Sequence, residues 1–106
     1  MKHSVWIEEA LVLAIHDRQL VEHGGAEGLR DESLLHSGLA RPRNHLAYEK
    51  ADVIQLAAMY TAGIVKNHPF IDGNKRTGFM AAYTFLGKQQ RELVASEPDA
   101  TLETLR

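Results

Sequence analysis

The chain has 106 residues, of which 44% are hydrophobic and 25% are charged. These fractions are typical of a globular protein and argue against intrinsic disorder, and the length predicts a single domain over residues 1–106. A net charge of −2 gives no strongly basic surface, so no direct nucleic-acid binding is expected, and the lack of cysteine excludes a disulfide scaffold, a cysteine zinc site and a cysteine nucleophile.

The N-terminal region shows no targeting signal. The apolar run after residues 1–4 is interrupted by Glu8 and Glu9, which leaves neither a clean hydrophobic segment nor a cleavage site. No stretch of the chain reaches the ~20 apolar residues of a bilayer-spanning helix. We therefore expect a cytoplasmic protein that makes no membrane contact.

The first predicted element is a helix over about residues 5–21. Ser4 is its candidate N-cap, and Gly24 and Gly25 end it because glycine adopts a left-handed conformation without steric cost. The spacing of its apolar residues is that of one helix face. The residues on this face are Ile7, Ala10, Leu11, Ala14 and Ile15.

A short helix is predicted next. Asp31 is placed to cap it, and Leu34, Leu35 and Leu39 follow at helical spacing. The sequence Arg-Pro-Arg-Asn at residues 41–44 is expected to end this helix, because proline disfavours helical backbone in the residue before it. Residues 45–50 are expected to form a further helical turn or a loop.

Two strongly apolar helices are predicted in the second half of the chain. In residues 51–66, eleven of sixteen positions are Ala, Val, Ile, Leu, Met or Tyr, and in residues 77–86 seven of ten are apolar and none is charged. Helices of this composition are buried on most sides. Because strand signals are weak throughout, the predicted fold class is all-α, with the 67–76 connection held between two central buried helices.

The chain becomes polar after Gly87. Residues 93–95 are expected to form a short extended or docking segment. Residues 96–99, Ser-Glu-Pro-Asp, combine a cap, an early proline and an acid, and therefore favour the start of a last helix. That helix is expected to be incomplete at Arg106.

The 67–76 connection contains the residue types of phosphate chemistry. Gly73 and Asn74 open a helix whose first N–H groups lack internal acceptors and attract anions. Lys75 and Arg76 add two positive charges at the same point, and the guanidinium group can bind phosphate oxygens in bidentate fashion. The first turn of this helix therefore favours a phosphate ligand.

Two further residues of the connection suit phosphoryl chemistry. Asp72 supplies hard oxygen ligands of the kind that Mg²⁺ shares with nucleotide phosphates. Histidine is the side chain most often used as a general base at neutral pH, so His68 is the candidate base.

An ordinary turn is the alternative interpretation of the same residues. In that case Asn74 or Asp72 only caps the next helix, and Lys75 and Arg76 only face water. Cations are mildly unfavourable at a helix N-terminus, however, and this misfit favours an anionic partner.

Residues 68–76, His-Pro-Phe-Ile-Asp-Gly-Asn-Lys-Arg, resemble the signature of the Fic/Doc superfamily, H-x-F-x-[D/E]-G-N-x-R. Lys75, with Thr77 following, resembles the Doc (death-on-curing) branch. The similarity includes residues 24–25, 28–31 and 40–42 and the apolar helix before the signature, so it covers nearly the whole chain and is weakest after Gly87. The resemblance implies a compact Fic-type helical bundle with the active-site loop between two central helices.

The resemblance also implies a function. Doc-like proteins are toxins of toxin–antitoxin systems that transfer the γ-phosphoryl group of ATP to a threonine of elongation factor Tu and so block translation. By this resemblance His68 and Arg76 are catalytic, with His68 as the base, and Asp72 holds Mg²⁺. Residues 73–76 (Gly73, Asn74, Lys75 and Arg76) then bind the nucleotide and neutralise the charge of the phosphoryl group.

The resemblance implies a protein inhibitor as well. Many Fic proteins contain an inhibitory helix with the pattern [S/T]-x-x-x-E-[G/N]. Here Glu27 and Gly28 match its end, but His23 occupies the position of the Ser or Thr. Inhibition is therefore expected from a Phd-type antitoxin whose amphipathic C-terminal helix docks in a groove near the active site.

Three alternative functions stay open. The first is a Fic-type adenylyl (AMP) transferase, although that group has glycine where Lys75 stands and a second arginine where Phe79 stands. The second is a catalytically silent Fic-fold binding module, although the intact signature argues against it. The third is a metal-dependent phosphohydrolase, suggested by the pair His16 and Asp17, for which no further ligands can be assigned.

Overall fold

The computed structural model describes residues 6–48 and 52–95, with side chains described for residues 6–45 and 52–91. Four helices make up this part of the chain: α1 (Glu9–His23), α2 (Glu32–Tyr48), α3 (Val53–Asn67) and α4 (Asn74–Ala95). Within the described residues the extended pairing is limited to one isolated antiparallel bridge, between Leu29 and Phe70. The predicted all-α fold class is confirmed.

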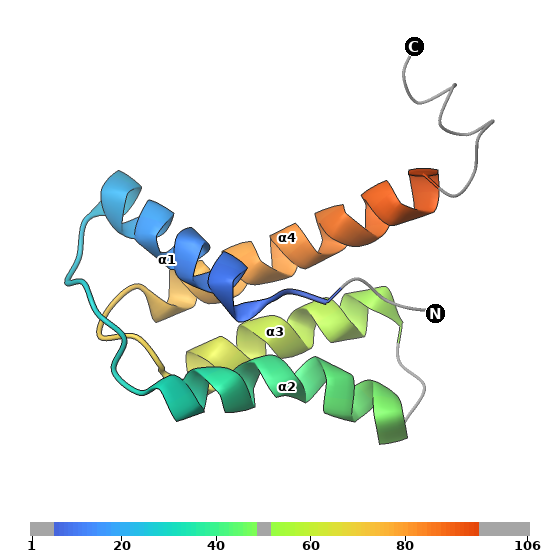
Figure 1. The fold of residues 1–106 in the computed structure, drawn as a ribbon, viewed down its shortest axis with the longest axis horizontal. Helices are drawn as coiled ribbons and strands as arrows, with labels where there is room; N and C mark the ends of the chain where they lie inside the picture. Colours follow the sequence, from blue (N-terminus) through green and yellow to red (C-terminus); the bar gives the residue numbers. More distant parts are fainter. Residues whose placement is uncertain (1–5, 49–51, 96–106) are drawn as a thin grey trace, which may run out of the picture.

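Helix α3 lies at the centre of the arrangement, between α2 and α4 (Figure 1). Helix α1 packs mainly on α4. The core between these helices is built around Tyr60 and Phe85, whose ring centroids are 5.1 Å apart. The Tyr60 hydroxyl accepts a hydrogen bond from the backbone N–H of Ile7 at 3.0 Å, which ties the segment before α1 to α3.

Helix α1 begins later than predicted and buries a different face. Its N-cap is Glu8, whose backbone is extended, while Ser4 lies outside the described residues. The N–H of Gly24 donates to the Leu20 carbonyl at 2.7 Å, so the predicted glycine stop is confirmed. Ala10 and Ala14 are exposed. The buried residues of α1 are Val12, His16 and Gln19.

Helix α2 begins as predicted but does not end at residues 41–44. Its cap is the Asp31 carboxylate, which accepts from the N–H groups of Ser33 and Leu34 at 2.9 and 3.3 Å. The helix then runs through Pro42 to Tyr48, so the expected break is wrong. A proline inside a helix costs about 3 kcal/mol, partly because it cannot donate to the carbonyl four residues earlier. Here Pro42 is fully buried, and its packing in the core offsets that cost.

The carbonyl that Pro42 leaves without its helical donor belongs to Gly38, and it lies against Gly63 of α3. A Cβ atom built at Gly38 would lie 2.9 Å from the Gly63 carbonyl oxygen. Real Cβ atoms do not come this close to backbone, so the two helices approach at a distance that only glycine allows. This contact fixes how α2 crosses α3.

Helix α3 begins at a reciprocal cap. The Asp52 carboxylate accepts from the N–H of Gln55 at 2.8 Å, and the Gln55 side chain accepts from the N–H of Asp52 at 3.1 Å. Leu56, Ala57, Tyr60 and Ile64 are buried, as the apolar composition predicts, whereas Ile54 is 67% exposed.

Helix α4 is longer and more exposed than predicted. It begins at Asn74 and continues through the polar residues 88–91 to Ala95, so the extended segment expected at residues 93–95 is wrong. Phe79 and Tyr83 are 60% and 72% exposed, so this helix is not buried on most sides. The helix expected from residues 96–99 lies outside the described residues. None of the described helices is both long and apolar enough to span a lipid bilayer.

We predict that Gly63→Ala lowers the free energy of unfolding by about 1–3 kcal/mol, because the added methyl group forces α2 away from α3. Urea denaturation measures this change. Gly87→Ala is the matched control, since among the described side chains a Cβ there would meet Arg91 Nη1 at 3.6 Å, an ordinary van der Waals contact. That control gains up to about 1 kcal/mol from helix propensity. Equal stability of the two variants would contradict a close α2–α3 contact.

Candidate active site

The candidate site begins where α3 ends. His68 adopts a left-handed conformation, with φ 54° and ψ 54°, and its N–H donates to the Ile64 carbonyl. This conformation costs a residue other than glycine about 1–2 kcal/mol. The Arg30 guanidinium holds it in place, donating to the carbonyls of His68 at 2.7 Å and Asn67 at 3.0 Å. A cation at a helix C-terminus is also favourable.

The loop after His68 is clamped by residues 24–31. The Pro69 carbonyl accepts from the N–H groups of Arg30 and Asp31 at 2.6 and 3.0 Å. The N–H of Ile71 donates to the Gly28 carbonyl at 3.0 Å. Pro69 and Phe70 are buried, so Phe70 faces the core and anchors the loop. The loop between α3 and α4 is therefore paired along its length with the α1–α2 connection.

Asn74, at the start of α4, closes the loop from the other side. Its Oδ1 accepts from the N–H of Phe70 at 2.9 Å, and its Nδ2 donates to the Phe70 carbonyl at 2.8 Å. These two bonds fix the orientation of the amide group, and Nδ2 lies 3.2 Å from Nδ1 of His68. Because an NH₂ group donates, Nδ1 accepts, and the neutral His68 ring carries its proton on Nε2. The Asn74 side chain is buried, so only its backbone is available to a ligand.

The Asp72 carboxylate is exposed and held by two backbone donors. Its Oδ2 accepts from the N–H of Ala26 at 3.1 Å, and its Oδ1 accepts from the N–H of Gly73 at 2.9 Å. These bonds, the one from Ala26 first, lower the pKa of Asp72 below its ordinary value, and the Arg76 charge acts in the same direction. The group is therefore ionised at neutral pH, and each oxygen keeps a lone pair for another partner.

All of the predicted site residues line one pocket of about 470 Å³. Helix α4 begins there, and its first backbone hydrogen bond runs from the Thr77 N–H to the Gly73 carbonyl. The N–H groups of residues 74–76 therefore have no acceptor within the helix. Within the described residues, neither Lys75 nor Arg76 forms an ion pair, and both are exposed. The pocket is lined by Val65, His68, Ile71, Asp72, Gly73, Asn74, Lys75 and Arg76.

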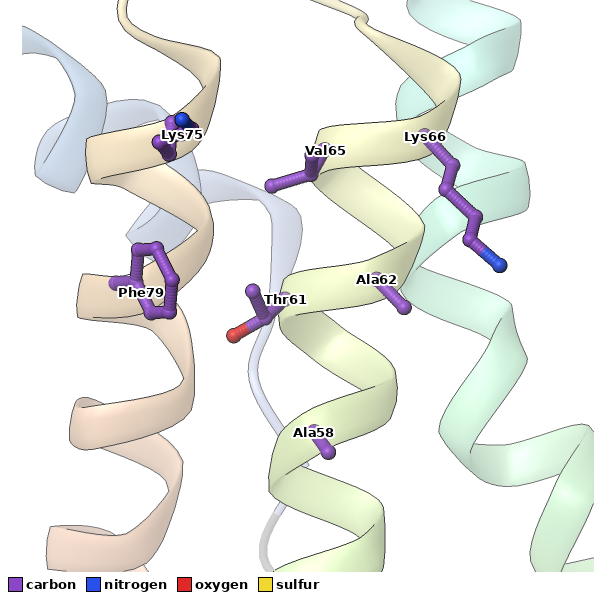
Figure 2. A pocket seen from close by; sticks show the side chains of 7 residues that line it. All are labelled: Ala58, Thr61, Ala62, Val65, Lys66, Lys75 and Phe79. Atoms are coloured by element: carbon purple, nitrogen blue, oxygen red, sulfur yellow. The ribbon is translucent and has the colours of Figure 1, made fainter.

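A second, apolar pocket of about 360 Å³ lies beside the first, between α3 and α4 (Figure 2). Val65 and Lys75 line both pockets. Figure 2 shows Thr61 and Val65 of α3 pointing toward α4, where Phe79 stands one turn after Lys75. The other lining residues are Ala58, Ala62 and Lys66.

Two residues near the site were not identified from the sequence as part of it. The sequence around Arg30 indicates no role for it, and His16 stands out only with Asp17 as a candidate metal-binding pair. In the structure His16 is buried and contacts the loop, whereas Asp17 is exposed. Among the described residues, the His and acidic side chains that cluster are Glu9, Glu32 and His36, so the phosphohydrolase interpretation has no ligand set.

We predict that Asn74→Ala lowers the free energy of unfolding by about 1–3 kcal/mol, because both buried backbone groups of Phe70 lose their partner. Urea denaturation provides the measurement. Asn44→Ala, at an exposed position of α2, is the control and changes stability by less than about 0.5 kcal/mol. If the Asn74 variant is as stable as this control, the hydrogen bonds between the Asn74 amide and the Phe70 backbone do not stabilise the loop.

Comparisons with known proteins identify the family of this chain. Residues 6–86 match the model of the Fic/DOC family. The chain is 32% identical over 76 residues to "Protein kinase doc" of Escherichia phage P1, covering 71% of this chain and 60% of the relative. It is 37% identical over 70 residues to "Toxin Doc" of Mycolicibacterium smegmatis, covering 62% and 52%. The matched region thus spans between about half and three fifths of these relatives. With its signature assembled around one pocket, the chain belongs to the Fic/Doc family, on the Doc branch.

Proposed function

We propose that this protein is the toxin of a toxin–antitoxin system and transfers the γ-phosphoryl group of ATP to a hydroxyl group of a protein. The observation that supports this best is the convergence of His68, Asp72, Lys75 and Arg76 on one pocket at the N-terminus of α4. The name of the phage P1 relative, a protein kinase, supports the same reaction class. The proposed acceptor is a threonine of elongation factor Tu, whose modification would block translation in the cytoplasm.

The residues around the pocket fit ATP with Mg²⁺. Asp72 would hold the metal, since its carboxylate is ionised, exposed and prepositioned by Ala26 and Gly73. Mg²⁺ is commonly bound through one or two carboxylates together with substrate phosphates. When bound, the ion would neutralise part of the phosphate charge.

The phosphates themselves have a separate set of donors. The backbone N–H groups of residues 74–76 and the two cations of Lys75 and Arg76 lie at the same helix end. Gly73, with φ 78°, makes the turn that brings the chain into α4. Most of the catalysis in phosphoryl transfer comes from positioning and charge neutralisation of this kind.

In the proposed reaction the acceptor oxygen forms a bond to the γ-phosphorus as the bond to the bridging oxygen breaks and ADP leaves. The hydroxyl proton passes to His68. In the neutral ring the lone pair is on Nδ1, so the hydroxyl would replace the 3.2 Å contact between Nδ1 and Asn74 Nδ2. His68 is exposed in the pocket and so accessible to an acceptor from outside.

Transfer of AMP is the second candidate. It requires the α-phosphate to face the acceptor, and Fic adenylyl transferases use a second arginine for that purpose. At that position Phe79 lines the apolar pocket instead, and Lys75 occupies the place of a small glycine. These two residues favour γ-phosphoryl transfer.

The test is a pair of reactions with purified elongation factor Tu, one with ATP labelled at the γ-phosphate and one with ATP labelled at the α-phosphate. We expect label in the factor only from the γ position, and intact mass should show the gain of one phosphate group. Label from the α position would establish AMP transfer instead. No label in either reaction, with no change in mass across a panel of other candidate acceptors, would favour a silent binding module.

The same assay tests the base. His68→Ala should reduce transfer by at least ~100-fold, the effect expected from losing a general base. Its urea denaturation curve should stay close to that of the wild type, because the His68 side chain is exposed. His23→Ala removes an exposed histidine at the end of α1 and should retain activity. Equal activity of the two variants would remove His68 from the mechanism.

Asp72→Ala should raise the Mg²⁺ concentration for half-maximal transfer by ~10-fold or more, a loss in the range seen when the environment of a metal is disturbed. Asp17→Ala, which removes an exposed carboxylate from α1, is the control and should leave the Mg²⁺ titration unchanged. A Mg²⁺ titration of the Asp72 variant that overlays that of the wild type would exclude Asp72 as the metal ligand.

We also propose a Phd-type antitoxin as the partner that inhibits this toxin. The inhibitory pattern within the chain is incomplete at His23, so the inhibitor would be another protein. The apolar pocket between α3 and α4 is bordered by Lys66 and Lys75 and adjoins the active site. An amphipathic helix with acidic flanks would suit it.

A further inference from the structure

His16 of α1 is a buried histidine that the proposed reaction does not use. Its ring is 3% exposed and stacks on Phe70, with the ring centroids 3.8 Å apart and the planes 8° from parallel. Its Nε2 lies 2.8 Å from the carbonyl oxygen of Asp72, 56 residues away in the sequence. Because a carbonyl oxygen only accepts, the proton of this hydrogen bond is on His16 Nε2.

We propose that His16 is a positioning residue that orients the Asp72 carboxylate through the peptide group between Asp72 and Gly73. In a trans peptide the C=O and N–H bonds point to opposite sides of the chain. The hydrogen bond from His16 fixes the direction of the Asp72 carbonyl, and therefore also that of the Gly73 N–H. This N–H donates to Oδ1 of Asp72 at 2.9 Å.

The surroundings of this peptide group leave it little other freedom. A Cβ atom built at Gly73 would lie 3.5 Å from the His16 ring, so the imidazole packs directly against this residue. On the other side, Oδ2 of Asp72 accepts from the N–H of Ala26 at 3.1 Å. A Cβ atom at Gly25 would come within 2.8 Å of Oδ2, so the backbone of residues 25 and 26 lies directly against one side of the carboxylate.

A purely structural role would not need an imidazole. The position lies between Val12 and Gln19 on the buried face of α1, where an apolar ring could provide the same stacking on Phe70. Only a polar side chain can donate the hydrogen bond to the Asp72 carbonyl. The inference rests on the proposed function in one respect, namely that Asp72 is the ligand of Mg²⁺.

Two variants separate the hydrogen bond from the packing. His16→Phe keeps an aromatic ring against Phe70 and removes the donor, whereas His16→Gln removes the ring and keeps an N–H donor near the position of Nε2. We expect the Phe variant to raise the Mg²⁺ concentration for half-maximal transfer ~10-fold, with the KM for the acceptor protein unchanged. In the Gln variant the Mg²⁺ concentration for half-maximal transfer should return most of the way to the wild-type value.

Two measurements do not depend on catalysis. Calorimetric titration of Mg²⁺ in the presence of a non-hydrolysable ATP analogue should show the same ~10-fold weakening in the Phe variant. Hydrogen exchange of the Gly73 amide, followed by NMR, should be faster in the Phe variant than in the wild type or the Gln variant. Should His16→Phe fail to fold, slow Gly73 exchange in His16→Gln would support the proposal and fast exchange would overturn it.

The proposal is overturned if His16→Phe matches the wild type in Gly73 exchange and Mg²⁺ affinity, since packing alone would then explain the residue. It is also overturned if the Gln variant is no better than the Phe variant in both measurements. Wild-type protein that transfers no phosphoryl group would overturn the proposed function instead, and the Gly73 exchange rates would still decide whether His16 orients the peptide.

Discussion

The rest of the site depends on the hydrogen bonds that the buried Asn74 side chain makes. It satisfies both backbone groups of Phe70 and contacts Nδ1 of His68, so one amide group links the end of α3 to the start of α4. An unsatisfied polar group at this depth would cost about 1–3 kcal/mol. The loop therefore has one favoured conformation, in which His68, Asp72 and the N-terminus of α4 surround the same pocket.

A second loop is hydrogen-bonded to this one and restrains its backbone. The backbone of Gly28, Arg30 and Asp31 pairs with that of Pro69 and Ile71, and the Arg30 guanidinium covers the last carbonyls of α3. Asp31 at the same time caps α2, so one short segment begins a helix and holds the candidate active site. A change in the α1–α2 connection would therefore reach the site without touching the signature residues.

Prediction from the sequence succeeded where local patterns decide the structure. The apolar composition of α3, the Asp31 cap and the Gly24 stop all depend on neighbours within a few residues. Prediction from the sequence was wrong where packing between distant elements decides the structure. Pro42 stays inside α2 because its ring is buried in the core, and α4 continues past residue 87 with Phe79 and Tyr83 exposed. The buried face of α1 differs from the predicted one because it includes His16, a polar residue with a partner in the α3–α4 loop.

The sequence by itself determined the family, the all-α class and six of the eight residues that line the pocket, because the signature is contiguous and its chemistry follows from residue type. Only the tertiary structure decided how those residues are oriented. The contacts that hold them come from His16, Ala26 and Arg30, which lie 37 to 56 residues away along the chain. Hydrogen bonds over such separations depend on how α1 and the α1–α2 connection pack against the α3–α4 loop, and no local pattern specifies that packing.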